Sequence, residues 1–143
     1  MSGIAGSSIQ RPLSERDYQA LARFRHALRV FQRFSENAAR AAGTTPSQHQ
    51  LLLAVRGWTG DRPPAVADLA DRLQLKHHST VELIQRATTA GLVSSATDPD
   101  DNRRQLTTIT PRGAELLASL SLEHRDELRR FRAEMHDVLN ELG

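Results

Sequence analysis

The sequence has 143 residues, enough for one domain with its own hydrophobic core, and it contains no cysteine. The lack of cysteine excludes disulfides, thiolate zinc sites and thiol redox sensing. No apolar run approaches the roughly 20 residues of a membrane span, and residues 1–12 lack the apolar core of a secretory signal, so we expect a cytoplasmic protein.

The net charge is only +2, but the charges are unevenly distributed along the chain. Residues 1–45 carry seven Arg against three acidic residues, and residues 72–112 carry six basic residues against four acidic ones. Residues 113–143, by contrast, carry four Arg against seven acidic residues. This distribution is compatible with one face that meets a polyanion, and equally with ordinary solvated helix faces.

The first third of the chain predicts a tail, a long helix and a shorter one. Residues 1–13 are mostly small and polar and are predicted to be a disordered tail. Ser14 and Asp17 form an N-cap signature, and apolar residues then recur at helical spacing up to Gly43, which predicts an amphipathic helix over 14–42. A second helix is predicted from Thr45-Pro46-Ser47 to about Arg56, followed by a Gly- and Pro-rich loop over 57–64.

Two short helices follow in quick succession. The stretch "VADLADRL", residues 66–73, places its apolar residues on one helical face, and a second helix is predicted from about His77 to Ala90, ended by Gly91. Two short helices joined by a tight turn are typical of a helix-turn-helix. Leu92-Val93 and residues 105–110 then predict a β-hairpin around a turn at 98–102.

Residues 111–113 break the second strand and lead into a final helix over about 112–141. The predicted fold class is therefore mainly α with a small antiparallel β-hairpin (α+β). A winged helix-turn-helix DNA-binding lobe is expected over 46–111, with long terminal helices in a dimerisation region formed by residues 14–45 and 112–143.

The first and last helices are each about 30 residues long, or roughly 40 Å at about 1.5 Å per residue, which is too long for so small a core to cover. A homodimer built from both helices is the economical interpretation, because a two-fold interface uses one surface twice. A monomeric long-helix bundle is the alternative. We interpret His124, in register with the apolar stripe, as a hydrogen-bonded interface residue rather than a ligand or pH sensor. The predicted dimerisation residues are Leu21, Leu28, Phe31, Leu120, Leu128, Phe131, Met135 and Val138.

Three stretches carry a resemblance to the MarR family of winged helix-turn-helix transcriptional regulators: "VADLADRL", "HHSTVELIQRATTAGLV" and "DPDDNRRQLTTITPRG". The resemblance covers residues 14–142. Its most specific part is the wing, where residues 98–103 match the family pattern Asp-Pro-x-Asp-x-Arg and residues 109–113 match Leu-Thr-x-x-Gly with Ile for Leu. The chain departs from the family at Ser94 and Ser95, where a basic residue is common, and at Ala87, where leucine is common.

A recognition helix must present polar side chains to the major groove while an apolar face anchors it. Here Val81, Leu83, Ile84 and Ala87 are expected to face inward. Arg86 either contacts phosphate or pairs with Asp68 or Asp71. The resemblance implies that Asp101 pairs with Arg103 and holds its guanidinium for a narrow minor groove. The predicted DNA-binding residues are Lys76, His77, His78, Ser79, Thr80, Arg86, Arg103 and Arg104.

Two other kinds of function compete with DNA binding. His77 and His78 project about 100° apart on a helix and cannot chelate one ion together, and His78 with Glu82 lacks an evident third ligand. Because no nucleophile elbow or phosphate loop is present either, we predict no enzyme, no metal and no cofactor. A winged-helix protein-interaction module without specific DNA binding is the alternative, although such a module would not need Arg103 at the wing tip.

The resemblance further implies a small, often aromatic, ligand between the terminal helices and the DNA-binding lobe. Candidate lining residues are His26, Arg29, His49, Leu52 and Trp58. In the alternative interpretation, Trp58 anchors the core or its loop, and His26 and His49 are surface residues. The expected function is a homodimeric repressor on an inverted-repeat operator, with half-sites about 10 bp apart.

Overall fold

The computed structural model describes residues 11–142, and the predicted tail lies outside the described residues except for 11–13, which have no regular structure. The described chain forms a mainly α fold with one two-stranded antiparallel hairpin, which confirms the predicted fold class. In chain order the elements are α1 (Glu15–Ala41), α2 (Pro46–Arg56), α3 (Val66–Leu73), α4 (His77–Thr89), β1 (Val93–Asp98), β2 (Asp101–Ile109) and α5 (Pro111–Glu141).

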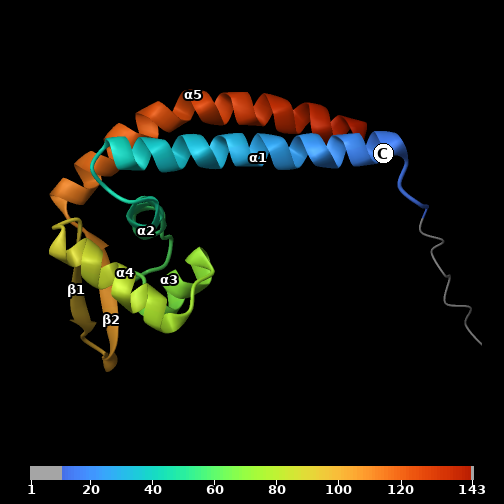
Figure 1. The fold of residues 1–143 in the computed structure, drawn as a ribbon. Helices are drawn as coiled ribbons and strands as arrows, with labels where there is room; N and C mark the ends of the chain where they lie inside the picture. Colours follow the sequence, from blue (N-terminus) through green and yellow to red (C-terminus); the bar gives the residue numbers. More distant parts are fainter. Residues whose placement is uncertain (1–10, 143) are drawn as a thin grey trace, which may run out of the picture.

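Two parts of the molecule can be told apart in Figure 1. Helices α1 and α5 run antiparallel, side by side, and together form what we call the arm. Helices α2, α3 and α4 and the hairpin gather at one end of the arm and form what we call the lobe. The lobe and the arm meet where α2 contacts both α1 and α5.

Helix ends lie where local chemistry predicts them. Ser14 Oγ accepts a hydrogen bond from the Asp17 N–H (3.2 Å) and the Asp17 carboxylate accepts one from the Ser14 N–H (3.0 Å), so a complete capping box begins α1. Thr45 caps α2 with a single bond, in which Thr45 Oγ1 accepts a hydrogen bond from the Gln48 N–H (3.1 Å). After α4 the chain reverses at Gly91, whose φ of +76° is in the left-handed region that favours glycine.

The lobe has a closed apolar core. Leu51 and Leu52 of α2, Leu69 of α3 and Ile84 of α4 are at most 6% exposed and belong to one cluster that Leu117 of α5 completes. The start of α5 packs tightly against Leu92, the residue before β1. A Cβ at Gly113 would lie only 2.1 Å from the Leu92 carbonyl oxygen. Glycine is therefore required at this close approach.

The hairpin is longer and its turn tighter than predicted. The second strand begins at Asp101 rather than at residue 105, so only Pro99 and Asp100 form the turn. Asp98 pairs with Asp101 after an irregularity in the register between Thr97 and Asp98. The α2–α3 loop lies along β2, since the Thr107 N–H donates to the Pro64 carbonyl (3.0 Å) and Ala65 forms a β-bridge with Leu106.

The seam between α1 and α5 is narrow and partly polar. Its fully buried positions include Ala20 and Ala39 of α1 and Leu120 and Val138 of α5. Leu120 and Val138 were predicted at a dimer interface, but they are buried within one chain because α1 and α5 pack on each other. Leu128, in contrast, is 48% exposed.

Phe31 and Phe131, also predicted at the dimer interface, are half-buried and contact each other across the seam with ring centroids 5.3 Å apart. His124 is hydrogen-bonded, as predicted, but its partners are in its own chain. Its Nε2 lies 2.9 Å from Ser35 Oγ and its Nδ1 lies 2.6 Å from the Leu120 carbonyl oxygen.

Candidate nucleic-acid interface

The outer face of α4 is polar and accessible. Lys76, which precedes the helix, and His77 and His78 in its first turn are exposed, and Ser79 is half-exposed. Farther along the helix Glu82, Gln85, Arg86 and Thr89 are exposed. No side chain caps the start of α4, so its first N–H groups are available to an anion such as a phosphate.

Thr80 does not belong to this outer face. Its side chain is 0% exposed and its hydroxyl donates to the Lys76 carbonyl (2.9 Å), so the prediction that Thr80 contacts DNA is wrong. The physical reason is its spacing: Thr80 lies three and four residues before Leu83 and Ile84 and seven before Ala87, on the helical stripe that packs into the lobe. That spacing was visible in the sequence.

The two histidines of α4 are also candidate metal ligands by residue type. Both His77 and His78 are exposed at the start of α4. Among residues 11–142, no group of three or more His, Cys, Asp or Glu side chains could hold a metal ion.

Arg86 forms no ion pair within the described part of the chain. One of its two suggested partners, Asp68, accepts the Ala65 N–H (2.9 Å) and lies 3.6 Å from Arg104. The acid that could have held Arg86 therefore contacts a residue of the wing instead, which leaves the Arg86 guanidinium on the open face of α4.

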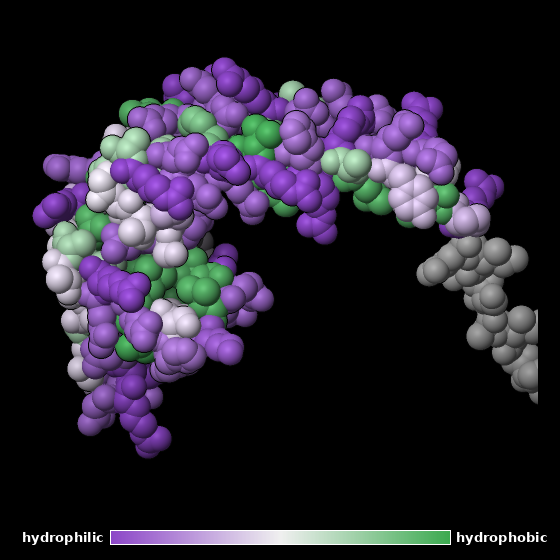
Figure 2. All heavy atoms as spheres, viewed as in Figure 1, coloured by the Kyte–Doolittle hydropathy of each residue, from purple (hydrophilic) through white to green (hydrophobic). Residues whose placement is uncertain are grey.

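The turn of the wing positions Arg103 through its backbone. Asp101 Oδ1 accepts a hydrogen bond from the Arg103 N–H (3.0 Å), whereas the prediction was a contact with the guanidinium. The correction follows from the tight turn, which brings the carboxylate to the main chain two residues on. Arg103 itself is exposed, and hydrophilic residues gather at the end of the hairpin in Figure 2.

Arg62 is a residue of this region that the sequence pattern did not reveal. Its Nη1 donates to Asp98 Oδ1 (2.8 Å), its Nη2 pairs with the Asp100 carboxylate, and the Asp100 N–H also donates to Asp98 Oδ1 (2.9 Å). The hydrogen bond to Asp100, with the charges of Asp100 and Asp98, raises the pKa of Arg62. Three aspartates in a predicted DNA-binding wing were a signal that a nearby cation was needed.

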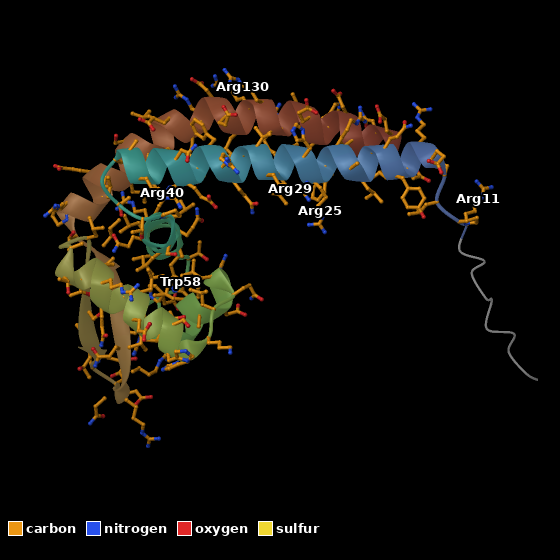
Figure 3. All side chains as sticks on the ribbon, viewed as in Figure 1. Arg11, Arg25, Arg29, Arg40, Trp58 and Arg130 are labelled. Atoms are coloured by element: carbon orange, nitrogen blue, oxygen red, sulfur yellow. The ribbon has the colours of Figure 1, made fainter. Side chains whose placement is uncertain are left out.

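The predicted ligand residues are not brought together around one cavity. His49 (4% exposed) and Leu52 (0%) are buried where α2 packs, while His26 and Arg29 are exposed on α1. Figure 3 shows Arg29 on the arm and Trp58 within the lobe, well separated. The Trp58 ring lies 5.4 Å from the Arg72 guanidinium carbon and its Nε1–H donates to the Arg62 carbonyl (3.1 Å).

A cavity of about 520 Å³ lies elsewhere, between α1, the start of α2 and the α3–α4 turn. Its apolar walls include Leu28, Phe31 and Leu75, and Gln32 and Arg72 contribute polar groups. None of the five predicted ligand residues lines it.

Comparison with known proteins places this geometry among winged helix proteins. A model of the MarR family matches residues 42–104, which span α2 to the first part of β2. No curated protein matches the sequence. Within residues 11–142, no helix is long and apolar enough to span a membrane.

Solved structures agree over most of the chain. The MarR family transcription regulator SP03579 is 25% identical, with 80% of this chain and 74% of that one covered and a TM-score of 0.69. AbsC, a MarR family transcriptional regulator from Streptomyces coelicolor, is 22% identical, with 87% and 84% covered and a TM-score of 0.72. A MepR mutant from S. aureus, bound to an oligodeoxyribonucleotide, is 19% identical, with 88% and 98% covered and a TM-score of 0.64.

Proposed function

We propose that this chain is a winged helix-turn-helix transcription regulator of the MarR family, whose model matches residues 42–104, and that it binds a specific double-stranded DNA operator through α4 and the wing. One observation carries the proposal. The open face of α4 is polar from Lys76 to Thr89 and lies beside a hairpin whose Arg103 is exposed.

The start of α4 has the chemistry to read a major groove. His77 and His78 can donate or accept hydrogen bonds at base edges, and Lys76 and Ser79 suit phosphate oxygens next to the uncapped helix start. Arg86, two turns farther on, suits a backbone phosphate. The structure of MepR with an oligodeoxyribonucleotide supports this use of the fold.

The wing suits the adjacent minor groove. Arg103 would enter the groove, where a narrow A·T-rich segment attracts guanidinium groups, and Asp101 would hold the backbone from which it projects. Arg104 would exchange its contact with Asp68 for a phosphate. Readout by the wing would depend mostly on DNA shape.

We infer that two copies act together. Large apolar side chains stay exposed on the arm, among them Tyr18 (55%), Val30 (47%), Leu128 (48%) and Leu139 (62%). A two-fold dimer would cover such residues and would place two α4 helices on an inverted repeat with half-sites about 10 bp apart. A repressor of this kind would act by occupying a promoter.

The 520 Å³ cavity is where we propose that a small aromatic acid would release the DNA. Its apolar walls suit a ring, and Arg72 supplies a cation for a carboxylate, which would bind at the end of the cavity away from Glu36. Because the cavity lies between the arm and the helix-turn-helix, a ligand there would alter the spacing of two recognition helices.

Selection of fragments that the protein binds from random DNA tests the function directly. We expect an inverted repeat and an affinity that falls steeply with salt. Selected sequences without two-fold symmetry would contradict the dimeric operator. Failure to enrich any sequence, with retention of the fold, would favour a protein-interaction module instead.

A further inference from the structure

We propose that Arg62 is a positioning residue for DNA binding: it clamps the turn of the wing by pairing with Asp98 and Asp100, and so fixes Arg103 and neutralises two carboxylates that would face phosphates. The part of this inference that concerns DNA rests on the proposed function. The clamp itself is a property of the free protein.

The clamp depends mainly on Asp98. The Asp98 side chain is 2% exposed, and its Oδ1 receives hydrogen bonds from Arg62 and from the Asp100 N–H. A buried carboxylate that loses its cation is strongly unfavourable, because one backbone donor cannot replace the lost solvation. The pair with Asp100, whose side chain is 66% exposed, contributes little because water screens it.

The loop that carries Arg62 is itself held in place. Trp58 Nε1–H donates to the Arg62 carbonyl (3.1 Å), and the Pro64 carbonyl accepts the Thr107 N–H of β2 (3.0 Å). A Cβ at Gly60 would lie 2.6 Å from Trp58 Nε1, so this turn of the loop is closely packed. Arg62 therefore extends from an anchored frame rather than from a free loop.

The charges of the hairpin are the reason that a DNA-binding wing needs this clamp. Asp98, Asp100 and Asp101 place three negative charges within a span of four residues, just before the only two arginines of the hairpin, Arg103 and Arg104. Without Arg62 the carboxylates would offset the arginines and repel phosphate. With Arg62, the charge of the turn region, Arg62 included, becomes neutral rather than negative.

Hydrogen exchange of the free protein tests the clamp without DNA. In Arg62→Ala we expect amides of residues 100–104 to exchange about tenfold faster, while amides of α4 and α5 keep their wild-type rates. Arg56→Ala is the matched control, since it removes an exposed arginine from the end of α2 that forms no ion pair among the described residues. Arg62→Lys keeps the charge and should fall between wild type and Arg62→Ala. Unchanged exchange at 100–104 would overturn the clamp.

A double-mutant cycle on the duplex selected by the wild-type protein tests the role in binding. In the wild-type background, Arg62→Ala should weaken binding about tenfold, whereas Arg56→Ala should weaken it by less than about threefold. In the Asp98→Asn/Asp100→Asn background, where the amide oxygen of Asn can still accept the N–H of residue 100, Arg62→Ala should cost less than about twofold.

The cycle separates a clamp from a direct phosphate contact and from a bulk charge effect. An equal loss in both backgrounds would mean that Arg62 contacts phosphate directly, and an equal loss in Arg56→Ala and Arg62→Ala would mean that only bulk charge matters. Either result overturns the positioning role. If the wild-type protein selects no duplex, the proposed function fails, while the exchange experiment still decides whether Arg62 clamps the wing.

Discussion

The lobe and the arm solve the problem of burying apolar surface in different ways. The lobe closes a core within one chain, in which Leu51, Leu52 and Leu69 are 0% exposed. Along its seam the arm buries small or polar residues of α1, such as Ala20, Ala39 and Ser35, together with Leu120 and Val138 of α5. Figure 2 shows hydrophobic residues scattered among hydrophilic ones along the arm.

The difference indicates that the lobe and the arm depend on different contacts for their stability. A lobe with large buried side chains is stable by the hydrophobic effect of one chain. Two long helices held by a narrow seam leave apolar side chains in water, which a second copy would remove from solvent. Stability of the lobe should therefore depend on its sequence alone, and stability of the arm also on protein concentration.

The largest expected effect is on the free energy of unfolding of the lobe. Leu69→Ala removes a fully buried side chain between α2 and α4 and should lower the free energy of unfolding by about 3–5 kcal/mol, because a cavity remains. Chemical denaturation at fixed protein concentration measures the loss. Leu53→Ala, at a position that is 50% exposed on α2, should cost less than about 1 kcal/mol. Similar losses for both variants would contradict a closed apolar core around Leu69.

The next effect concerns the arm. Leu128→Glu places a charge on an exposed apolar position of α5, and we expect it to weaken self-association by about 2–4 kcal/mol while the lobe stays folded. Sedimentation equilibrium over a range of concentrations is the measurement. Leu53→Glu, with a matched exposure of 50% in the lobe, serves as the control. A monomeric wild-type protein, or equal effects of both substitutions, would show that the arm is complete in one chain.

Local structure followed from the sequence more accurately than contacts between residues distant in sequence. The caps at Ser14 and Thr45 and the reversal at Gly91 set helix ends because they act within a few residues. The pair of Arg62 with Asp98 joins residues 36 apart, and nothing in the local pattern specified it. The helical spacing of Thr80 from Leu83 and Ala87 indicated burial, but its polar side chain suggested an exposed position.

The same limit applies to the candidate site. Exposure of Lys76, His77 and His78 followed from the helical pattern, because polar residues at the start of a short helix seldom pack inward. Burial of Leu120 and Val138 within one chain did not follow, since the stripe of one helix looks the same whether α1 or a second copy covers it.

A substitution at Arg103 tests the proposed DNA-binding role of the lobe and leaves its core unchanged. Arg103→Ala should weaken binding to the selected operator by about 1–3 kcal/mol if the guanidinium enters the minor groove, with no change in thermal unfolding. A gel-shift titration at moderate salt gives the affinity. Arg129→Ala, on the arm, removes an equal charge far along α5 and should leave affinity unchanged. Equal affinities of the wild type and Arg103→Ala would exclude Arg103 from the groove.

The smallest effect is expected at the joint between lobe and arm, where His49 of α2 faces His124 of α5 with ring centroids 4.9 Å apart. His49 is 4% exposed, and its Nδ1 has no hydrogen-bond partner among the described residues. Burial lowers the pKa of His49 from its usual value near 6.5, and repulsion by His124 lowers it further.

Because the folded state then binds fewer protons than the unfolded one, the stabilising contribution is complete above pH 6.5 and is lost as the pH falls through the lowered pKa of His49. Denaturation of the wild type between about pH 7.5 and 5.5 should show this decline. His49→Leu should keep most of the stability at the upper end of that range, since an apolar side chain leaves no unpaired nitrogen, and should flatten the decline. His26→Leu, on the exposed face of α1, should reproduce the wild-type profile. A decline of unchanged size in His49→Leu would show that another group titrates, and that His49 does not cause the loss of stability at low pH.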